Sequence, residues 1–196
     1  MYYISKYIEI KEGCIYKNGE LEMQSSTSDF SDMMKEWYKS LHLSYPKFYK
    51  MDDLCKMAFI ASERLLEGET SKEIALLFSN SEASLDTDIK HQQSIQTTDA
   101  YFPSPAIFVY TLPNIAIGEV SIRHQLKTES AFLVSDEYPI EEMHTYTEYL
   151  LQHKKAEKVL CAWIHKLENS YHAFFYLVEN QGDLPHTKQI INKIFI

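Results

Sequence analysis

Glycine and proline are scarce in this sequence, with five and six residues respectively among 196. Such a low content argues against collagen-like, linker-rich or disordered architectures. Hydrophobic residues make up 45% of the chain, which is enough for one sizeable core. We therefore expect a single domain over residues 1–196, built mainly from regular helices and strands.

Long basic tracts and long apolar runs are also missing. The formal net charge of -9 repels polyanions, and no Lys/Arg-rich tract interleaved with aromatic residues overrides it. The longest apolar runs, 159–164 and 173–178, are too short to span a bilayer, and the first ten residues lack the pattern of a signal peptide. We expect a cytoplasmic protein that binds neither nucleic acid nor membrane.

The cysteines and histidines form no recognisable metal motif. Cys14, Cys55 and Cys161 are odd in number and lack C-x-x-C spacing, which argues against a disulfide framework and a zinc cluster. The eight histidines include no His-x-x-x-His pair. We expect no metal and no cofactor. Cys55 lies on an apolar helical face and Cys161 in an apolar strand, so both are interpreted as core residues rather than nucleophiles.

Hydrophobic periodicity predicts strands and helices in alternation. Residues 3–10 alternate as a strand does, with turns near Gly13 and at Asn18-Gly19. Helical spacing from Met51 predicts a helix that Asp52 caps and Gly68 ends. Further strands are predicted at 74–78, 131–134, 159–164 and 173–178, the last two as an antiparallel hairpin.

The remaining segments are expected to be helical. They comprise 84–96, a mostly buried segment at 106–126 interrupted by Pro113, a helix that Pro139 opens at its first position, and a short helix from about Pro185. The order of elements implies an α/β layer fold with helices on both faces of the sheet.

Several stretches, read together, resemble the N-terminal half of a β-ketoacyl synthase of the thiolase-like superfamily. They are Lys50-Met51-Asp52, FSNSEASL at 78–85, PSPAIFVYTLPNIAIG at 103–118, SIRHQLKTESAFLVSD at 121–136, AEKVLCAWI at 156–164 and HAFFYLVEN at 172–180. The resemblance covers roughly residues 1 to 180. It implies a three-layer α/β/α half of the thiolase-like fold, with a mixed five-stranded sheet.

The chain departs from that family where the nucleophile belongs. Members carry an Ala-Cys-x-Thr type of turn after the strand, whereas this sequence has Ser135-Asp136-Glu137-Tyr138. In the family's register Glu137 stands at the cysteine position. Ser135 is an alternative nucleophile only in a slipped alignment. We expect the Glu137 carboxylate to lie near the free amides of the helix that Pro139 opens.

The resemblance implies a catalytically incomplete protein, although the sequence leaves enzyme activity undecided. A ketosynthase needs a thiolate that accepts an acyl group from a carrier protein, and a glutamate cannot hold a thioester. The family's two histidines and lysine for decarboxylation belong to the second half, and the residues after Asn180 are too few to contain them. An ionised Glu137 would also repel a malonyl carboxylate.

Other polar groups have simpler interpretations. His124 and His144 near the candidate site are interpreted as packing or surface residues. The cluster Lys154, Lys155 and Lys158 could contact an acidic acyl carrier protein, although a solvated helix end is the favoured interpretation.

Two functions from different classes follow. The first is a ketosynthase-like partner subunit in acyl-carrier-protein-dependent synthesis of fatty acids, polyketides or aryl polyenes. It would pair with a ketosynthase or with itself through the apolar segment 106–126. The second is a stand-alone module that binds an acyl group or another small molecule. A hydrolase that uses Ser135 ranks last.

Overall fold

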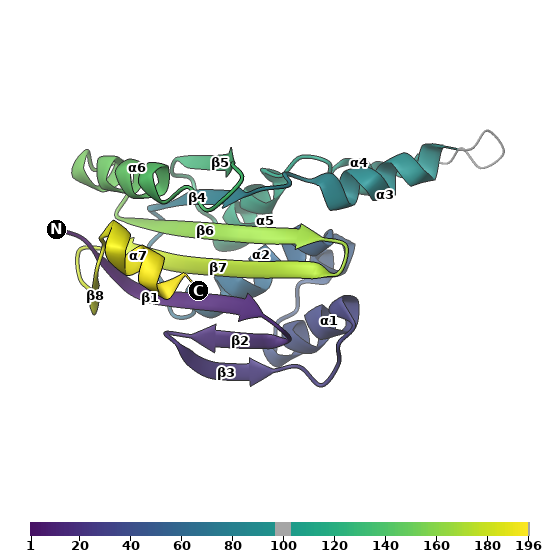
Figure 1. The fold of residues 1–196 in the computed structure, drawn as a ribbon, viewed down its shortest axis with the longest axis horizontal. Helices are drawn as coiled ribbons and strands as arrows, with labels where there is room; N and C mark the ends of the chain where they lie inside the picture. Colours follow the sequence, from purple (N-terminus) through teal and green to yellow (C-terminus); the bar gives the residue numbers. More distant parts are fainter. Residues whose placement is uncertain (97–102, 196) are drawn as a thin grey trace.

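The protein is built around one mixed sheet, seen in a computed structural model that describes residues 1–96 and 103–195 (Figure 1). The strand order is β3-β2-β1-β7-β6-β4-β5, and β8 pairs with β1. The strands are β1 (Tyr3–Lys11), β2 (Cys14–Lys17), β3 (Glu20–Gln24), β4 (Ile74–Asn80), β5 (Ser130–Val134), β6 (Lys158–Leu167), β7 (Ser170–Glu179) and β8 (Leu184–Pro185).

The five expected strands are neighbours in this sheet, in the order β1-β7-β6-β4-β5, and β5 forms one edge. β4 runs parallel to β5 and β6, whereas β7 is antiparallel to both β6 and β1. Every residue of β4 is buried, as its continuous apolar run predicted. The described sheet has eight strands rather than five, because β2 and β3 extend one edge and the two-residue β8 adds to β1.

The turns of the N-terminal strands follow the sequence signals. Glu12 and Gly13 both have positive φ angles, and so do Asn18 and Gly19, at 53° and 84°. Two successive positive φ values make a type I′ turn, which matches the twist of a hairpin and favours Asn-Gly. The Asn18 side chain also accepts a hydrogen bond from the amide of Tyr7, at 2.9 Å. Both predicted turns are confirmed.

One face of the sheet is covered by α1 (Phe30–Ser40), the 3-10 helix η1 (Pro46–Lys50), α2 (Asp53–Leu65) and α5 (Ile115–His124). Helix α2 contacts β1, β6 and β7 as well as α1 and α5. Its N-cap is Asp52, whose side chain accepts a hydrogen bond from the Cys55 amide at 2.9 Å. The chain ends this helix at Leu65, and Gly68 follows with a φ of 75°.

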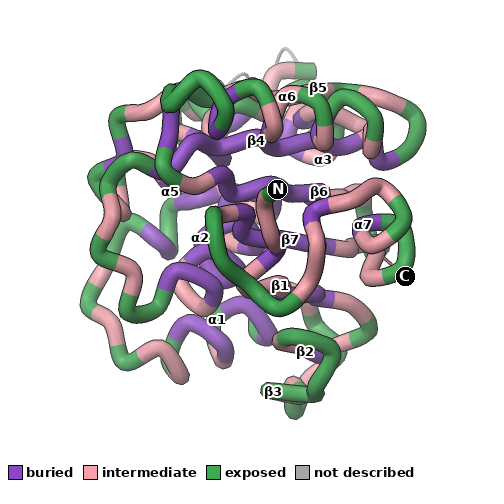
Figure 2. The backbone as a smooth tube through the Cα atoms, turned by 90° about the vertical axis from the view of Figure 1, so that its left-hand side faces the viewer, coloured by how far each residue is buried: buried purple, intermediate pink, exposed green. Residues whose placement is uncertain are grey.

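The opposite face is covered by α6 (Ile140–Gln152) and α7 (Lys188–Ile194). Met143, Leu150 and Leu151 of α6 and Ile191 of α7 are buried against alternate residues of β4, β6 and β7. Seen along the sheet, the central strands are buried between two partly exposed helical layers (Figure 2). The three-layer α/β/α arrangement with helices on both faces is thus confirmed.

Helices α3 (Leu85–Ile95) and α4 (Pro105–Phe108) form an arm that projects past the end of β4 (Figure 1). The expectation of a mostly buried segment at 106–126 is only half right. Within it, α5 buries Ala116, Ile117 and Val120, whereas Phe108, Val109, Leu112 and Ile122 are exposed. In the described part of the chain, no helix combines the length and apolar character needed to cross a membrane.

Candidate functional site

The turn between β5 and α6 carries the residues that sequence reasoning placed at the family's nucleophile. The amide of Ser135 donates to the carbonyl of Asn80, at 3.0 Å, so the turn continues the pairing of β5 with β4. Ser135 is half-buried, and Asp136 and Glu137 are exposed. Tyr138 then points into the core, where its hydroxyl donates to that of Tyr176 at 2.9 Å. Burial raises the pKa of Tyr138 well above its usual range.

The start of α6 differs from the prediction. Pro139 is the N-cap, with φ -79° and ψ 71°, and the first helical residue is Ile140. No side chain of the described residues caps this end, so the Glu137 carboxylate does not hold the first free amides. The cause is local: Pro139 already occupies the cap and lacks the side-chain oxygen that capping needs. Glu141 and Glu142 supply negative charge in the first turn instead.

The turn forms one wall of an open cleft of about 770 Å³. The opposite wall comes from the C-terminal helix, through Asn192 and Phe195. Four carboxylates line this cleft, from Asp136, Glu137, Glu141 and Glu142, and its lining contains neither a thiol nor an imidazole. The negative charge of this cleft opposes binding of a further carboxylate, such as that of a malonyl group.

The cysteines lie elsewhere and are all buried. Cys161 of β6 contacts the Thr147 hydroxyl at 3.2 Å, and burial raises its pKa to about 12. Burial and the nearby Asp52 carboxylate raise the pKa of Cys55 well above its usual range. A thiol in this state is a poor nucleophile, which agrees with the interpretation of both residues as core.

The two histidines do not line the cleft beside the turn. His124 ends α5, with its Nε2 3.3 Å from a carboxylate oxygen of Glu63. Burial lowers the pKa of His124, which favours the neutral ring. His144 lies on α6 and stacks on His186, with ring centroids 4.7 Å apart.

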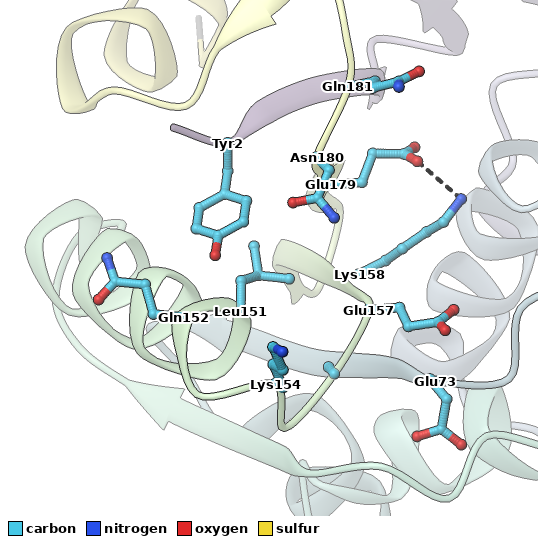
Figure 3. Close-up of a pocket in the computed structure, with 11 residues that line it drawn as sticks. Tyr2, Glu73, Leu151, Gln152, Lys154, Glu157, Lys158, Glu179, Asn180 and Gln181 are labelled. Atoms are coloured by element: carbon cyan, nitrogen blue, oxygen red, sulfur yellow. Dashed lines mark ion pairs between the residues drawn. The ribbon is translucent and has the colours of Figure 1, made fainter.

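The three lysines do not form one cationic patch. Lys158 of β6 pairs with Glu69 at 2.6 Å and Glu179 at 3.0 Å. Lys154 and Lys155 are exposed after α6. Lys154 and Lys158 line a cleft of about 750 Å³. Figure 3 shows Glu73, Glu157 and Glu179 among the residues that line it with them. Carboxylates therefore offset the charge of Lys158 and place negative charge beside Lys154, which weakens the attraction to an acidic carrier protein.

A buried polar group beneath the arm was missed by sequence reasoning. Glu119 of α5 is only 3% exposed, accepts a hydrogen bond from the Tyr110 hydroxyl at 3.1 Å and pairs with Lys47 at 2.7 Å. Burial and the Glu119 charge raise the pKa of Tyr110 above its usual range. The available signal was a single carboxylate within the apolar run 115–120. These contacts anchor the arm-to-α5 connection to the core.

Comparison with known proteins gives one clear result, and it concerns the fold. No protein-family model matches this sequence, and no curated protein matches it significantly. Solved structures do match. A ketosynthase in complex with its chain length factor from Xenorhabdus doucetiae aligns with a TM-score of 0.62 over 92% of this chain and 79% of that chain, at 14% identity. The chain has the ketosynthase fold.

Two further structures support the likeness. The ishigamide ketosynthase/chain length factor aligns with a TM-score of 0.68 and 16% identity, over 91% of this chain and 62% of that one. A type II polyketide synthase acyl-carrier protein in complex with its ketosynthase bound to the hexaketide gives a TM-score of 0.67 at 10% identity, with coverages of 98% and 64%. The chain thus spans under two thirds of these two ketosynthase-fold chains, as expected for a partial ketosynthase fold.

Proposed function

We propose that this chain is a ketosynthase-like subunit without condensing activity of its own, which works by pairing with a ketosynthase in acyl-carrier-protein-dependent synthesis. The observation that carries the proposal is the turn after β5. On a ketosynthase fold, that turn presents Ser135, Asp136 and Glu137 and no thiol. Fatty acid, polyketide and aryl polyene synthesis are the pathway classes that use such proteins.

The chemistry of the turn supports a non-elongating role. Acyl transfer needs a nucleophile that a base or a lowered pKa activates. The Ser135 hydroxyl donates to the Glu137 carbonyl at 2.5 Å, and no imidazole bonds to it among the described residues. Four carboxylates around the cleft oppose decarboxylation of a malonyl group, because its negative charge has to enter an acidic site.

The arm supplies a surface suited to a partner. Phe108 at the end of α4 is 62% exposed, and Val109 and Leu112, which directly follow the arm in the chain, are 51% and 57% exposed. Leu85 and Ile89 of α3 are further exposed apolar residues. The ring of His91 packs against Phe108 at 5.4 Å, which joins α3 to α4. Exposed apolar surface of this kind marks interaction sites. We assign it to a ketosynthase subunit, because two of the similar folds come from complexes or pairs of a ketosynthase with a chain length factor.

Carrier-protein binding belongs, in this proposal, to the ketosynthase partner. The chain carries a net charge of -9, and of the lysines at 154, 155 and 158 it is Lys158 that is paired with carboxylates. Long-range electrostatics therefore disfavour direct encounter with an acidic carrier protein.

The stand-alone binding module is less well supported. Sites for acyl chains and other small molecules are concave and mainly apolar. Two open clefts of the described residues, of about 750 and 770 Å³, are instead lined mainly by charged and polar side chains.

The test is co-purification from the native cell. A tagged chain should retain a ketosynthase that has an intact cysteine, at one-to-one stoichiometry. The variant carrying Phe108→Ser and Leu112→Ser should lose that partner. Leu21→Ser is the matched control, since Leu21 is 55% exposed on β3, away from the arm. A chain that retains no ketosynthase, or retains it equally in the arm variant, contradicts the proposal.

A further inference from the structure

Three potential metal ligands meet where α6 packs beside the segment that leads into α7. His144 and Glu148 are four residues apart on α6, so they share one face of the helix. His186 follows β8 and precedes Thr187, the N-cap of α7. One ring nitrogen of each histidine and one carboxylate oxygen of Glu148 all lie within 4.8 Å of one another.

Two hydrogen bonds orient the side chains of His144 and Glu148 in this cluster. His144 Nε2 lies 3.2 Å from the carbonyl of His186, and the second nitrogen of a metal-binding histidine commonly donates to such a carbonyl. Gln152 donates to the second oxygen of Glu148 at 3.3 Å, which orients that carboxylate. These two contacts use His144 Nε2 and one oxygen of Glu148, so His144 Nδ1 and the other Glu148 oxygen are the atoms proposed as ligands.

The buried member is His186, whose side chain has no exposed surface. Its Nδ1 lies 3.0 Å from Glu148, while its Nε2 is buried without a hydrogen-bond partner in the described chain. A buried imidazole with one unpartnered nitrogen is uncommon, because buried polar atoms are normally satisfied. Glu148 is 23% exposed and leaves the cluster open to an entering ion.

We propose that His144, Glu148 and His186 form a site for a divalent transition metal ion, best matched by Zn²⁺, with water as the fourth ligand. Two imidazoles and one carboxylate are a ligand set that zinc takes up in tetrahedral geometry. Bonds of about 2.0–2.2 Å place such ligand atoms about 3.5 Å apart, so the cluster has to close by about 1 Å. The His144 ring, which stacks on His186 with an interplanar angle of 14°, has to turn out of that stack to aim at the same ion, and rotation of the half-buried His144 and Glu148 side chains supplies the movement.

The site would fasten the C-terminal helix to the sheet layer. The His186 amide already donates to the Tyr2 carbonyl at 2.9 Å, so a metal on its ring would join the N-terminus, α6 and α7. Helix α7 is followed by Phe195, whose ring packs on Tyr138 at 4.9 Å and lines the cleft beside the turn. Metal binding is therefore expected to slow amide exchange in α7 and to raise the melting temperature.

The test titrates EDTA-treated protein with Zn²⁺ by calorimetry and with Co²⁺ by visible absorption. The expected results are one ion per chain, d–d bands typical of tetrahedral Co²⁺ and slower amide exchange in α7. His144→Ala and Glu148→Gln, both at half-buried positions, should each weaken Zn²⁺ binding at least about tenfold while the metal-free proteins stay folded. Controls are His153→Ala and Glu142→Gln, exposed residues on or beside the same helix. No binding, or binding that is unchanged in both ligand variants, overturns the site.

Discussion

The hydroxyl of Ser135 donates to the backbone carbonyl of Glu137 at 2.5 Å, so its proton is held in a hydrogen bond within the turn. A serine nucleophile must give that proton to a base during attack. We predict that incubation with acyl-CoA or acyl carrier protein leaves the intact mass of the chain unchanged. Ser135→Ala serves as the control. A stable acyl adduct present in the wild type and absent in the variant would show that Ser135 is reactive after all.

The thiols of Cys55 and Cys161 should be equally unreactive toward alkylation in the folded protein. Burial raises the pKa of Cys161 to about 12 and that of Cys55 well above its usual range, so both remain protonated at pH 8. Iodoacetamide at that pH should label neither thiol in native protein and both in urea, as peptide mass spectrometry can show. Rapid native labelling of Cys55 or Cys161 would contradict the assigned burial.

Glu137→Cys should place a thiol at the position that the proposed function assigns to the family's nucleophile, without restoring activity. Glu137 is exposed, and its carboxylate does not cap α6. The free energy of unfolding should therefore change by no more than about 1 kcal/mol. Condensation of acyl and malonyl carrier proteins should stay undetectable, because the turn lacks decarboxylating histidines. Asp136→Cys, one residue away and also exposed, is the matched control. Product formed by Glu137→Cys alone would show that the chain has a complete site.

The base of the arm should be sensitive to acid. Lys90 of α3 lies 3.0 Å from Asp53 and 2.7 Å from Asp86. Burial alone would raise the pKa of each carboxyl, but the lysine pairs and hydrogen bonds outweigh it and lower both pKa values. Carboxyls with lowered pKa stabilise the fold above their unfolded pKa, about 3.9, and lose that contribution as the pH falls through the folded pKa.

Lys90→Gln tests whether the pairs of Lys90 with Asp53 and Asp86 stabilise the fold at neutral pH and lose that effect in acid. The half-exposed ammonium limits the expected loss at pH 7 to about 1 kcal/mol, and the difference from wild type should shrink below about pH 4. Urea unfolding at pH 7 and pH 3 measures it. Lys155→Gln removes the same charge from an exposed site after α6 and should change little at either pH. A difference that grows toward pH 3 would contradict the assigned pairs.

Local patterns were sufficient to predict the core of the fold. Residues 74–78 are a continuous apolar run, the strand Ile74–Asn80 that contains them is buried on both faces, and Asn18-Gly19 makes the expected turn. The exposed arm was misread because Phe108 and Leu112 are as apolar as core residues, and only the tertiary arrangement leaves them uncovered. The two-residue β8 has no periodicity of its own, since its pairing with β1 depends on the fold.

The candidate site was predictable in position but not in detail. The apolar strand and Pro139 bracket the turn in the sequence, which located Ser135 and Glu137 correctly between β5 and α6. The cap geometry depends on the backbone angles of Pro139, which no spacing rule specifies. His144 and His186 are 42 positions apart, and the fold of β8 against β1 is what brings them together. The His-x-x-x-Glu spacing on α6 was the available signal for that cluster.

The central claim is that the chain acts as a subunit that pairs through its arm. Sedimentation velocity of the purified chain mixed with the ketosynthase that co-purifies with it tests this most directly. We predict a one-to-one complex that Phe108→Ser with Leu112→Ser abolishes and Leu21→Ser leaves intact. Two species that sediment independently at micromolar concentrations, or a complex unaffected by the arm substitutions, would contradict the account.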